Sequence, residues 1–158
     1  AHRLVTVAQG GGVTWVDDSK ATNPHSASAA LSALEPGTGV WIVGGDTKGA
    51  QFHDLVRQVA VRLRAAVVIG ADQTEVLDAL ARQAPQVPVR RVPHGGPREV
   101  VDGAVAAAAA LARPGDTVML APACASWDQF SSYAQRGDLF AAAARDHVRR
   151  GTTDQERD

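Results

Sequence analysis

The feature that most constrains the fold is a regular alternation between short apolar runs and longer segments whose apolar residues recur every three or four positions. Short apolar runs bounded by Gly, Pro or polar residues predict strands. They cover residues 4–9, 13–17, 40–43, 66–69, 89–92 and 117–120. The helical spacing predicts a helix that begins at about residue 24 and further helices over 52–63, 76–81, 100–111 and 139–148. Strands that alternate with helices in this way form a mostly parallel sheet covered on both faces.

The expected fold class is therefore α/β, a Rossmann-like three-layer sandwich. Three glycines at 10–12 separate the first two strands, so an N-terminal β-hairpin is expected to contribute an antiparallel strand. We expect residues 1–150 to form one domain and residues 151–158 to be a disordered polar tail. The first strand begins so close to His2 and Arg3 that we expect an interdomain hinge there, and a chain that is a fragment.

Composition narrows the classes of partner. The 16 basic and 17 acidic residues give a formal charge of -1, so no long-range positive field favours nucleic acid or an anionic membrane, and we expect neither as a partner. No apolar run approaches the length of about 18 residues that a membrane span needs. The single cysteine excludes an intrachain disulfide framework, which suits the reducing cytoplasm. A small-molecule partner fits best.

Polar residues gather where three of the predicted strands end, in the stretches DSKATN at 18–23, GGDTKG at 44–49 and PACASWD at 122–128. Because the carboxyl ends of parallel strands meet at one edge of a sheet, we expect these three stretches to line one cleft. Asn23 and Pro24 have the N-cap and first-turn preferences of a helix start. The first stretch also fits a well-capped turn with solvated charges.

Lys48 offers a mobile ammonium that suits a carboxylate or phosphate, although GGDTKG is too short for a Walker A loop. A glycine turn with a surface lysine explains the same residues. Ser126 is placed to N-cap a helix, and Gln129 completes a capping-box pattern. Such a helix end attracts carboxylates, but capping alone also accounts for Ser126.

The other reactive side chains predict little chemistry of their own. Cys124 is expected to be a small buried hydrophobe. Trp127, Phe130 and Tyr133 are expected to form one wall of a pocket or part of the core. The remaining candidates are histidines without metal-ligand spacing, which we place at the surface or at helix ends: His25, His53, His94 and His147. With no complete phosphate-binding loop and no magnesium carboxylate set, the chain looks like half of an active site.

Taken together, the motifs resemble the C-terminal domain of the Mur ligase family, in particular of the members that add D-glutamate. His2-Arg3, DSKATN, GGDTKG, PACASWDQF and QRG at 135–137 stand in that family's order and spacing. The resemblance implies one domain of an ADP-forming amide ligase of cytoplasmic peptidoglycan synthesis, inactive alone. It implies ATP, Mg²⁺, D-glutamate and UDP-N-acetylmuramoyl-L-alanine as ligands, with N-terminal and central domains of the same protein as partners. Mg²⁺ is then held mainly by the central domain, and no metal ligand is expected here.

The resemblance also assigns roles to individual residues. It implies that Arg3, Asp18 and Lys20 contact ATP. It implies that Thr22, Lys48 and Ser126 hold the carboxylates of D-glutamate. Trp127 and Tyr133 occupy wall positions of the same pocket, where the family pattern has leucine and phenylalanine, so pocket shape differs more than substrate class. No residue of this domain is expected to be catalytic by itself.

Two other hypotheses remain open from the sequence. One is a free-standing Rossmann-like module that binds a nucleotide or an amino acid. The other is the C-terminal domain of a Mur ligase that adds a different amino acid, such as L-lysine or meso-diaminopimelate.

Overall fold

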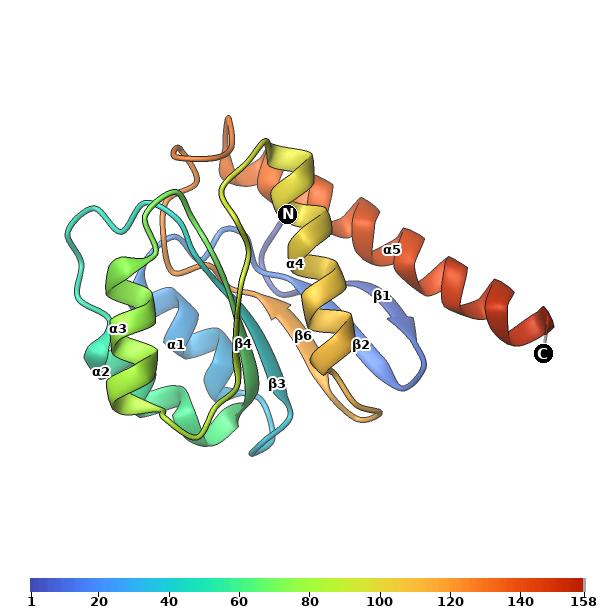
Figure 1. Cartoon of the computed structure of the whole chain (residues 1–158), viewed down its shortest axis with the longest axis horizontal. Coiled ribbons are helices and arrows are strands. Elements are labelled where there is room, and N and C mark those ends of the chain that lie inside the picture. The colour runs from blue at the N-terminus through green and yellow to red at the C-terminus, as the bar shows by residue number, and fades with distance from the viewer. Residues whose placement is uncertain (158) are drawn as a thin grey trace.

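The chain folds into a six-stranded sheet with helices on both faces (Figure 1). The computed structural model describes residues 1–157, and the side chains of residues 1–152. The strands are β1 (Val5–Gly10), β2 (Val13–Asp17), β3 (Gly39–Gly44), β4 (Leu63–Ile69), β5 (Val89–Arg91) and β6 (Thr117–Leu120). The helices are α1 (Pro24–Ser32), α2 (His53–Val59), α3 (Thr74–Gln83), α4 (Pro97–Leu111) and α5 (Tyr133–Arg157), with a 3-10 turn η1 (Ala60–Arg62).

The strand order is β1-β2-β6-β3-β4-β5. Strand β1 runs antiparallel to β2, and all other neighbouring pairs are parallel. The predicted α/β sandwich with an N-terminal hairpin is therefore confirmed. Because β6 inserts between β2 and β3, the loops that follow these three strands become neighbours at the carboxyl edge of the sheet.

The two faces of the sheet are buried in two separate cores, as the alternation of side chains along a strand requires. Trp41 and Val43 of β3 pack in the core beneath α1, α2 and α3. Val40 and Ile42 point to the opposite face, into the core beneath α4 and α5. Every residue of β3 is buried, which is typical of a central strand of a parallel sheet.

The start of α1 confirms the predicted cap. Asn23 is extended, its Oδ1 accepts a hydrogen bond from Ser26 N at 3.0 Å, and Pro24 occupies the first turn. The helix predicted over 52–63 is shorter than expected, because its last turn tightens into η1 and Leu63 is already the first residue of β4. These differences move element ends by a few residues and leave the topology unchanged.

Helix α5 extends to Arg157, so the backbone is helical over residues 151–157, for which the sequence analysis expected a disordered tail. No proline interrupts this segment, and one glycine at 151 costs only about 1 kcal/mol of helix propensity. Asp158 lies outside the described residues. Among the helices that are described, none combines the length and the apolar character needed to cross a bilayer.

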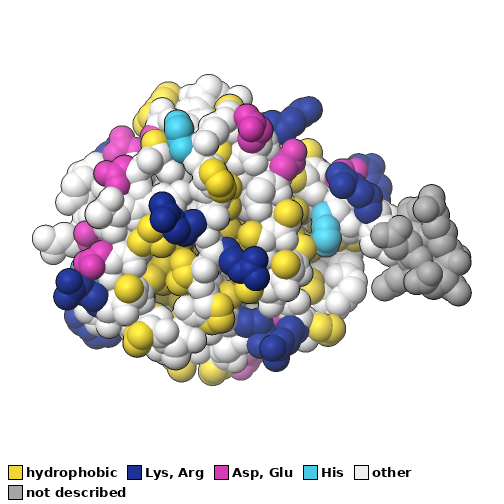
Figure 2. All heavy atoms as spheres, viewed as in Figure 1, with side chains coloured by type: hydrophobic (Ala, Val, Ile, Leu, Met, Phe, Trp, Pro, Cys, Tyr) yellow, Lys and Arg dark blue, Asp and Glu magenta, His cyan; other side chains and the backbone are white. Residues whose placement is uncertain are grey.

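Basic and acidic side chains are interspersed on the face that Figure 2 shows, and the basic ones stand in separate places over the helices and strands. This distribution agrees with the nearly balanced charge of the chain.

Candidate functional site

The three loops singled out from the sequence form one continuous edge, held together by backbone hydrogen bonds. Asp18 N, after β2, donates to Leu120 O at the end of β6 at 2.9 Å. Ala123 N donates back to Ala21 O at 2.9 Å, so the first and third loops are bonded in both directions. Backbone hydrogen bonds also limit how far these loops move apart.

The second and third loops are joined more closely. Asp46 and Ala125 form an antiparallel bridge, in which Asp46 N donates to Ala125 O at 3.0 Å and Ala125 N donates to Asp46 O at 2.9 Å. Lys48 stands two residues after one end of this bridge, and Ser126 stands one residue after the other. The loops that carry Lys20, Lys48 and Ser126 therefore lie along one edge of the sheet, with both lysines exposed and Ser126 buried. Whether their side chains share one cleft stays a prediction.

Glycines permit this close approach. Gly44 and Gly45 have φ of 127° and 138°. A Cβ at Gly44 would lie 2.0 Å from Ile69 O, and one at Gly45 would lie 2.6 Å from Ala125 O. These glycines are therefore needed for packing of the loop against protein backbone, whatever ligand the loop binds.

The two lysines of this edge are exposed, and within the described residues neither has a carboxylate partner. Lys48 adopts φ of 51°, a left-handed conformation, and its N–H donates to Asp46 Oδ1 at 3.0 Å. This Asx-type turn fixes the backbone of the loop, and it does not neutralise the ammonium group of Lys48. These two cations stand on the loops that flank the third loop, and neither has a carboxylate partner in the described part of the chain, which makes the edge suited to an anion.

The residues expected at the wall differ in exposure. Trp127 is 69% exposed and Tyr133 is 37% exposed, whereas Phe130 is buried in the core. Thr22 is half-buried and Arg3 is exposed. An exposed tryptophan beside Ser126 offers an apolar surface that is not used by the fold.

The predicted capping role of Ser126 is wrong. Residues 126–130 form a single turn closed by Phe130 N donating to Ser126 O at 2.8 Å, and α5 begins only at Tyr133. Gln129 does not return to Ser126: its Oε1 accepts from Gly70 N at 2.9 Å, and its Nε2 lies 3.0 Å from His94 Nδ1. The glutamine ties this turn to the end of β4, so no helix N-terminus lies at Ser126.

Asp18 is buried, and a buried carboxylate is seldom found without hydrogen-bond partners. Its Oδ1 accepts a hydrogen bond from Leu4 N at 3.1 Å. Burial raises the pKa of Asp18 above its ordinary value, opposed by the hydrogen bond from Leu4 and by the nearby charge of Arg3. The N-terminal segment is thus attached directly to the first loop.

Arg136 is the structural residue that sequence reasoning missed, although its QRG motif was noticed. The side chain is fully buried. Its Nε donates to Ser19 Oγ at 2.9 Å, its Nη2 to Ser19 O at 2.7 Å and its Nη1 to Cys124 O at 3.1 Å. Burial lowers the pKa of Arg136 to about 10, so the guanidinium stays charged at neutral pH. Arg136 therefore cross-links the first loop, the third loop and α5. Two of its three hydrogen bonds go to backbone carbonyls, and no sequence pattern indicates such bonds.

The other candidates behave as expected or as structural residues. Cys124 is buried, and burial raises the pKa of its thiol to about 12, which makes it unreactive. His53 Nε2 lies 3.2 Å from Asp78 Oδ2 at a helix surface, and the His147 ring packs 5.5 Å from that of Trp15. Within residues 1–152, no group of three or more His, Cys, Asp or Glu side chains is placed to hold a metal ion.

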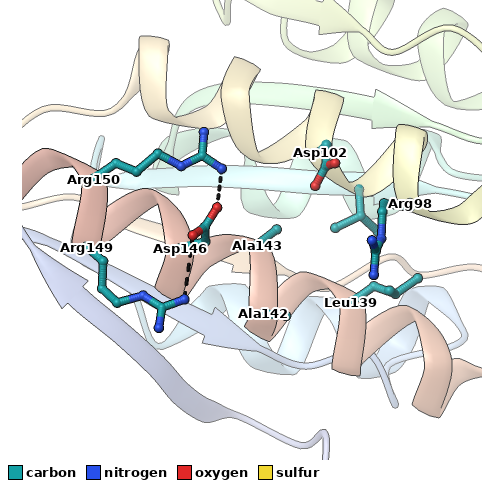
Figure 3. A pocket seen from close by; sticks show the side chains of 9 residues that line it. Arg98, Asp102, Leu139, Ala142, Ala143, Asp146, Arg149 and Arg150 are labelled. Carbon is teal, nitrogen blue, oxygen red and sulfur yellow. Dashed lines mark hydrogen bonds and ion pairs between the residues drawn. The ribbon is translucent and has the colours of Figure 1, made fainter.

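A groove of about 320 Å³ lies between α4 and α5, with Arg98 and Asp102 on one helix and Leu139 on the other (Figure 3). At its far end Asp146 pairs with Arg149 and Arg150. None of the lining residues belongs to the three loops, and the groove opens on the helix layer. We therefore place the candidate site at the loop edge.

Comparison with known proteins identifies the family to which the chain belongs. The family model described as Mur ligase, glutamate ligase domain matches residues 2–124. The chain therefore belongs to the Mur ligase family and corresponds to its C-terminal domain.

Curated relatives narrow the comparison. The chain is 54% identical over 146 residues to UDP-N-acetylmuramoylalanine--D-glutamate ligase of Streptomyces coelicolor, covering 92% of this chain and 30% of the relative. It is 57% identical over 145 residues to the ligase of the same name from Frankia casuarinae, covering 92% and 29%. The chain thus spans about 30% of the length of these relatives.

Solved structures agree on the fold. A murein peptide ligase from Psychrobacter arcticus superposes with a TM-score of 0.56 at 12% identity, covering 90% of this chain and 30% of that one. A MurF ligase from Thermotoga maritima in complex with ADP gives a TM-score of 0.52 at 17% identity, covering 94% and 31%.

Proposed function

We propose that this chain is the C-terminal domain of an ATP-dependent, ADP-forming ligase that adds D-glutamate to UDP-N-acetylmuramoyl-L-alanine in cytoplasmic peptidoglycan synthesis. The relatives that bear this activity in their names are about half identical to the chain along nearly its whole length. The observation that carries the proposal is the two-way bridge between Asp46 and Ala125, which makes the loops of Lys48 and Ser126 neighbours.

In this proposal D-glutamate lies against Lys48, Ser126 and Thr22. A substrate with two carboxylates needs cationic or hydroxyl donors for both, and a neutral amino acid leaves such donors unpaired. Lys48 is free to serve as one donor because nothing in the described part of the chain neutralises it. Trp127 and Tyr133 form the apolar wall, which agrees with the exposure of both side chains.

ATP lies further toward the first loop. Asp18 accepts hydrogen bonds from the ribose, Arg3 lies toward the nucleotide, and Lys20 lies close to the phosphates. The exposed, unpaired ammonium of Lys20 suits a polyphosphate, which carries several acceptor oxygens. The central domain supplies the phosphate-binding loop and most of the Mg²⁺ ligands, and the N-terminal domain holds the UDP portion.

The reaction is the one that the resemblance to the ligase family implies. A carboxylate oxygen of UDP-N-acetylmuramoyl-L-alanine attacks the γ-phosphorus of ATP, and ADP leaves. The amine of D-glutamate then attacks the acyl phosphate, the tetrahedral intermediate expels phosphate, and an amide bond remains. This chain binds and orients the attacking amino acid, a contribution that depends on positioning and on fixed charge. Without the other domains it makes no acyl phosphate.

The test uses the complete enzyme with D-glutamate, L-lysine or meso-diaminopimelate as the acceptor. Ligation is expected with D-glutamate alone. Lys48→Ala and Ser126→Ala should each raise the KM for D-glutamate by about tenfold to a hundredfold, as loss of a charge-assisted hydrogen bond predicts. Arg57→Ala, which removes an exposed cation on α2, serves as the control. Equal turnover with L-lysine would reject D-glutamate as the specific substrate. Turnover by the 158-residue chain alone would reject the proposal that the reaction needs the other domains.

A further inference from the structure

The N-terminal segment is held against the body of the domain by the side chain of His2. Its Nδ1 lies 2.6 Å from Asp17 Oδ2, and its Nε2 lies 3.3 Å from Asp138 Oδ1. The ring meets that of Tyr133 edge-on, with 6.1 Å between centroids and 84° between planes. We call the surroundings formed by Asp17, Tyr133, Gly137 and Asp138 the His2 seat. Because Asp17 ends β2 and the other three residues lie in the first turns of α5, the seat joins these two elements.

Gly137 makes room for the seat. A Cβ at this position would lie 2.3 Å from His2 Nδ1 and 2.7 Å from Asp17 Oδ2. Any other residue there displaces the imidazole or the carboxylate. Glycine weakens a helix. The space that the His2 seat requires explains why α5 carries a glycine at position 137.

Asp17 connects the seat to the first loop. Its side chain is only 3% exposed, and its Oδ1 accepts from Ser19 N at 2.9 Å while its Oδ2 faces the imidazole. The imidazolium form of His2 donates to both Asp17 and Asp138, and a neutral tautomer donates to one of them. Each ring nitrogen of His2 therefore faces a carboxylate acceptor.

The main chain on either side of the ring is strained and tied to the same loop. His2 and Leu4 have φ of 62° and 51°, in the left-handed region that side chains with a Cβ seldom adopt. His2 O accepts from Lys20 N at 3.0 Å, and Leu4 N donates to Asp18 Oδ1 at 3.1 Å. Such strain persists only where the surroundings fix it, and the His2 seat supplies that constraint.

We propose that His2 is a positioning residue for the nucleotide: seated between Asp17 and Asp138, it fixes the backbone so that Arg3 and Lys20 face the phosphates of ATP. His2 itself touches no substrate. The inference rests on the proposed function, because it assumes that this edge meets ATP. It concerns chiefly the nucleotide, since Lys48 and Ser126 lie on the second and third loops and are not part of the seat, whereas Tyr133 is common to the seat and to the wall of the proposed D-glutamate pocket.

The test measures the Kd for a non-hydrolysable ATP analogue and the KM values for ATP and D-glutamate in the complete enzyme. His2→Ala and Gly137→Ala should each weaken ATP binding by about tenfold, the loss of one charge-assisted hydrogen bond. The KM for D-glutamate should rise clearly less than the KM for ATP, because Lys48 and Ser126 lie on other loops. Asp138→Asn, at a position whose side chain is 74% exposed, should give a smaller change in the same direction without loss of folding. His2→Asn, which keeps one donor near Nδ1, should restore most of the affinity.

The matched control is His53→Ala, because His53 also pairs with an aspartate, Asp78, but on the surface of α2 and α3. It should leave both KM values unchanged. If ATP affinity is unaltered in His2→Ala and Asp138→Asn, the positioning role is wrong. If both KM values rise together, His2 is merely structural. A wild-type enzyme that binds the ATP analogue but does not ligate D-glutamate would reject the proposed function instead, and the analogue Kd would still decide the role of His2.

Discussion

The two ends of the central strands differ in whether their charged side chains are paired. At the amino end, before β6, the buried carboxylate of Asp116 pairs with Arg64 and accepts from Arg113 N at 2.8 Å, and Gly115 N donates to Gly12 O at 2.8 Å. At the carboxyl end, Lys20 and Lys48 have no carboxylate partner within the described residues. Charges that a fold needs are paired inside it, whereas charges left unpaired at a strand edge are available to a ligand.

Two charged groups at the carboxyl end are buried and partnered, Asp17 beside His2 and Arg136, and Arg136 explains how this end stays rigid. It is charged and buried, but its partners are the hydroxyl and carbonyl of Ser19 and the carbonyl of Cys124. The guanidinium therefore holds the loops together through neutral partners. The two lysines remain available to an anion.

The largest effect is expected from Arg136→Ala. The variant leaves the carbonyls of Ser19 and Cys124 without donors, and several unsatisfied buried groups should lower the free energy of unfolding by about 3–5 kcal/mol. Urea unfolding of the 158-residue chain measures this loss. Arg57→Ala, at an exposed pair with Asp54, is the control and should cost less than about 1 kcal/mol. A similar small cost for Arg136→Ala would mean that the edge is held by its backbone bonds alone.

Asp116→Ala comes next and tests the amino end. It removes the partner of Arg64 and of Arg113 N, so the free energy of unfolding should fall by about 2 kcal/mol. Ligation by the complete enzyme should keep its KM for D-glutamate. A selective rise of that KM would show that the paired end also contributes to binding, against the contrast drawn here.

Lys20→Ala and Lys48→Ala should change the free energy of unfolding by less than about 0.5 kcal/mol, because neither ammonium has a partner among the side chains that the structure describes. Alanine keeps the Cβ of lysine, so the left-handed conformation of Lys48 is strained equally in the variant. Calorimetric unfolding of the chain checks both. A marked loss of stability would reveal a structural role for these lysines.

The smallest effect concerns pH and Asp18. Burial raises the pKa of Asp18 in the folded chain, so the folded state holds its proton more tightly than the unfolded state does. This contribution to stability is present below the unfolded pKa and is lost as pH rises through the folded pKa. Asp18→Asn, which keeps an acceptor for Leu4 N, should abolish the part of the pH dependence that sets in as pH rises above the ordinary pKa of 3.8. An identical slope in both proteins would contradict the assignment.

The sequence predicted the elements and their common edge because hydrophobic periodicity and strand-to-helix order are local signals. The position of α1 at Asn23 and Pro24 followed from capping chemistry in the same way. The shape of the third loop did not, because Gln129 bonds to Gly70 and His94 instead of returning to Ser126. A capping-box pattern says nothing about a competing partner 59 residues away.

The roles of Arg136, Asp17 and Gly137 were also beyond sequence reasoning. Their contacts join the end of β2 to α5, more than a hundred residues apart, and backbone carbonyls or an absent Cβ leave no compositional mark. The insertion of β6 between β2 and β3 is the single topological fact that brings all of them together.

The most direct test of the central claim is a double-mutant cycle on Lys48 and Ser126 in the complete enzyme, with kcat/KM for D-glutamate as the readout. If both side chains hold one ligand, the effects of Lys48→Ala and Ser126→Ala should be non-additive by about 1 kcal/mol. Strictly additive effects, or a single variant that leaves kcat/KM for D-glutamate unchanged, would show that these two loops do not grip the same amino acid.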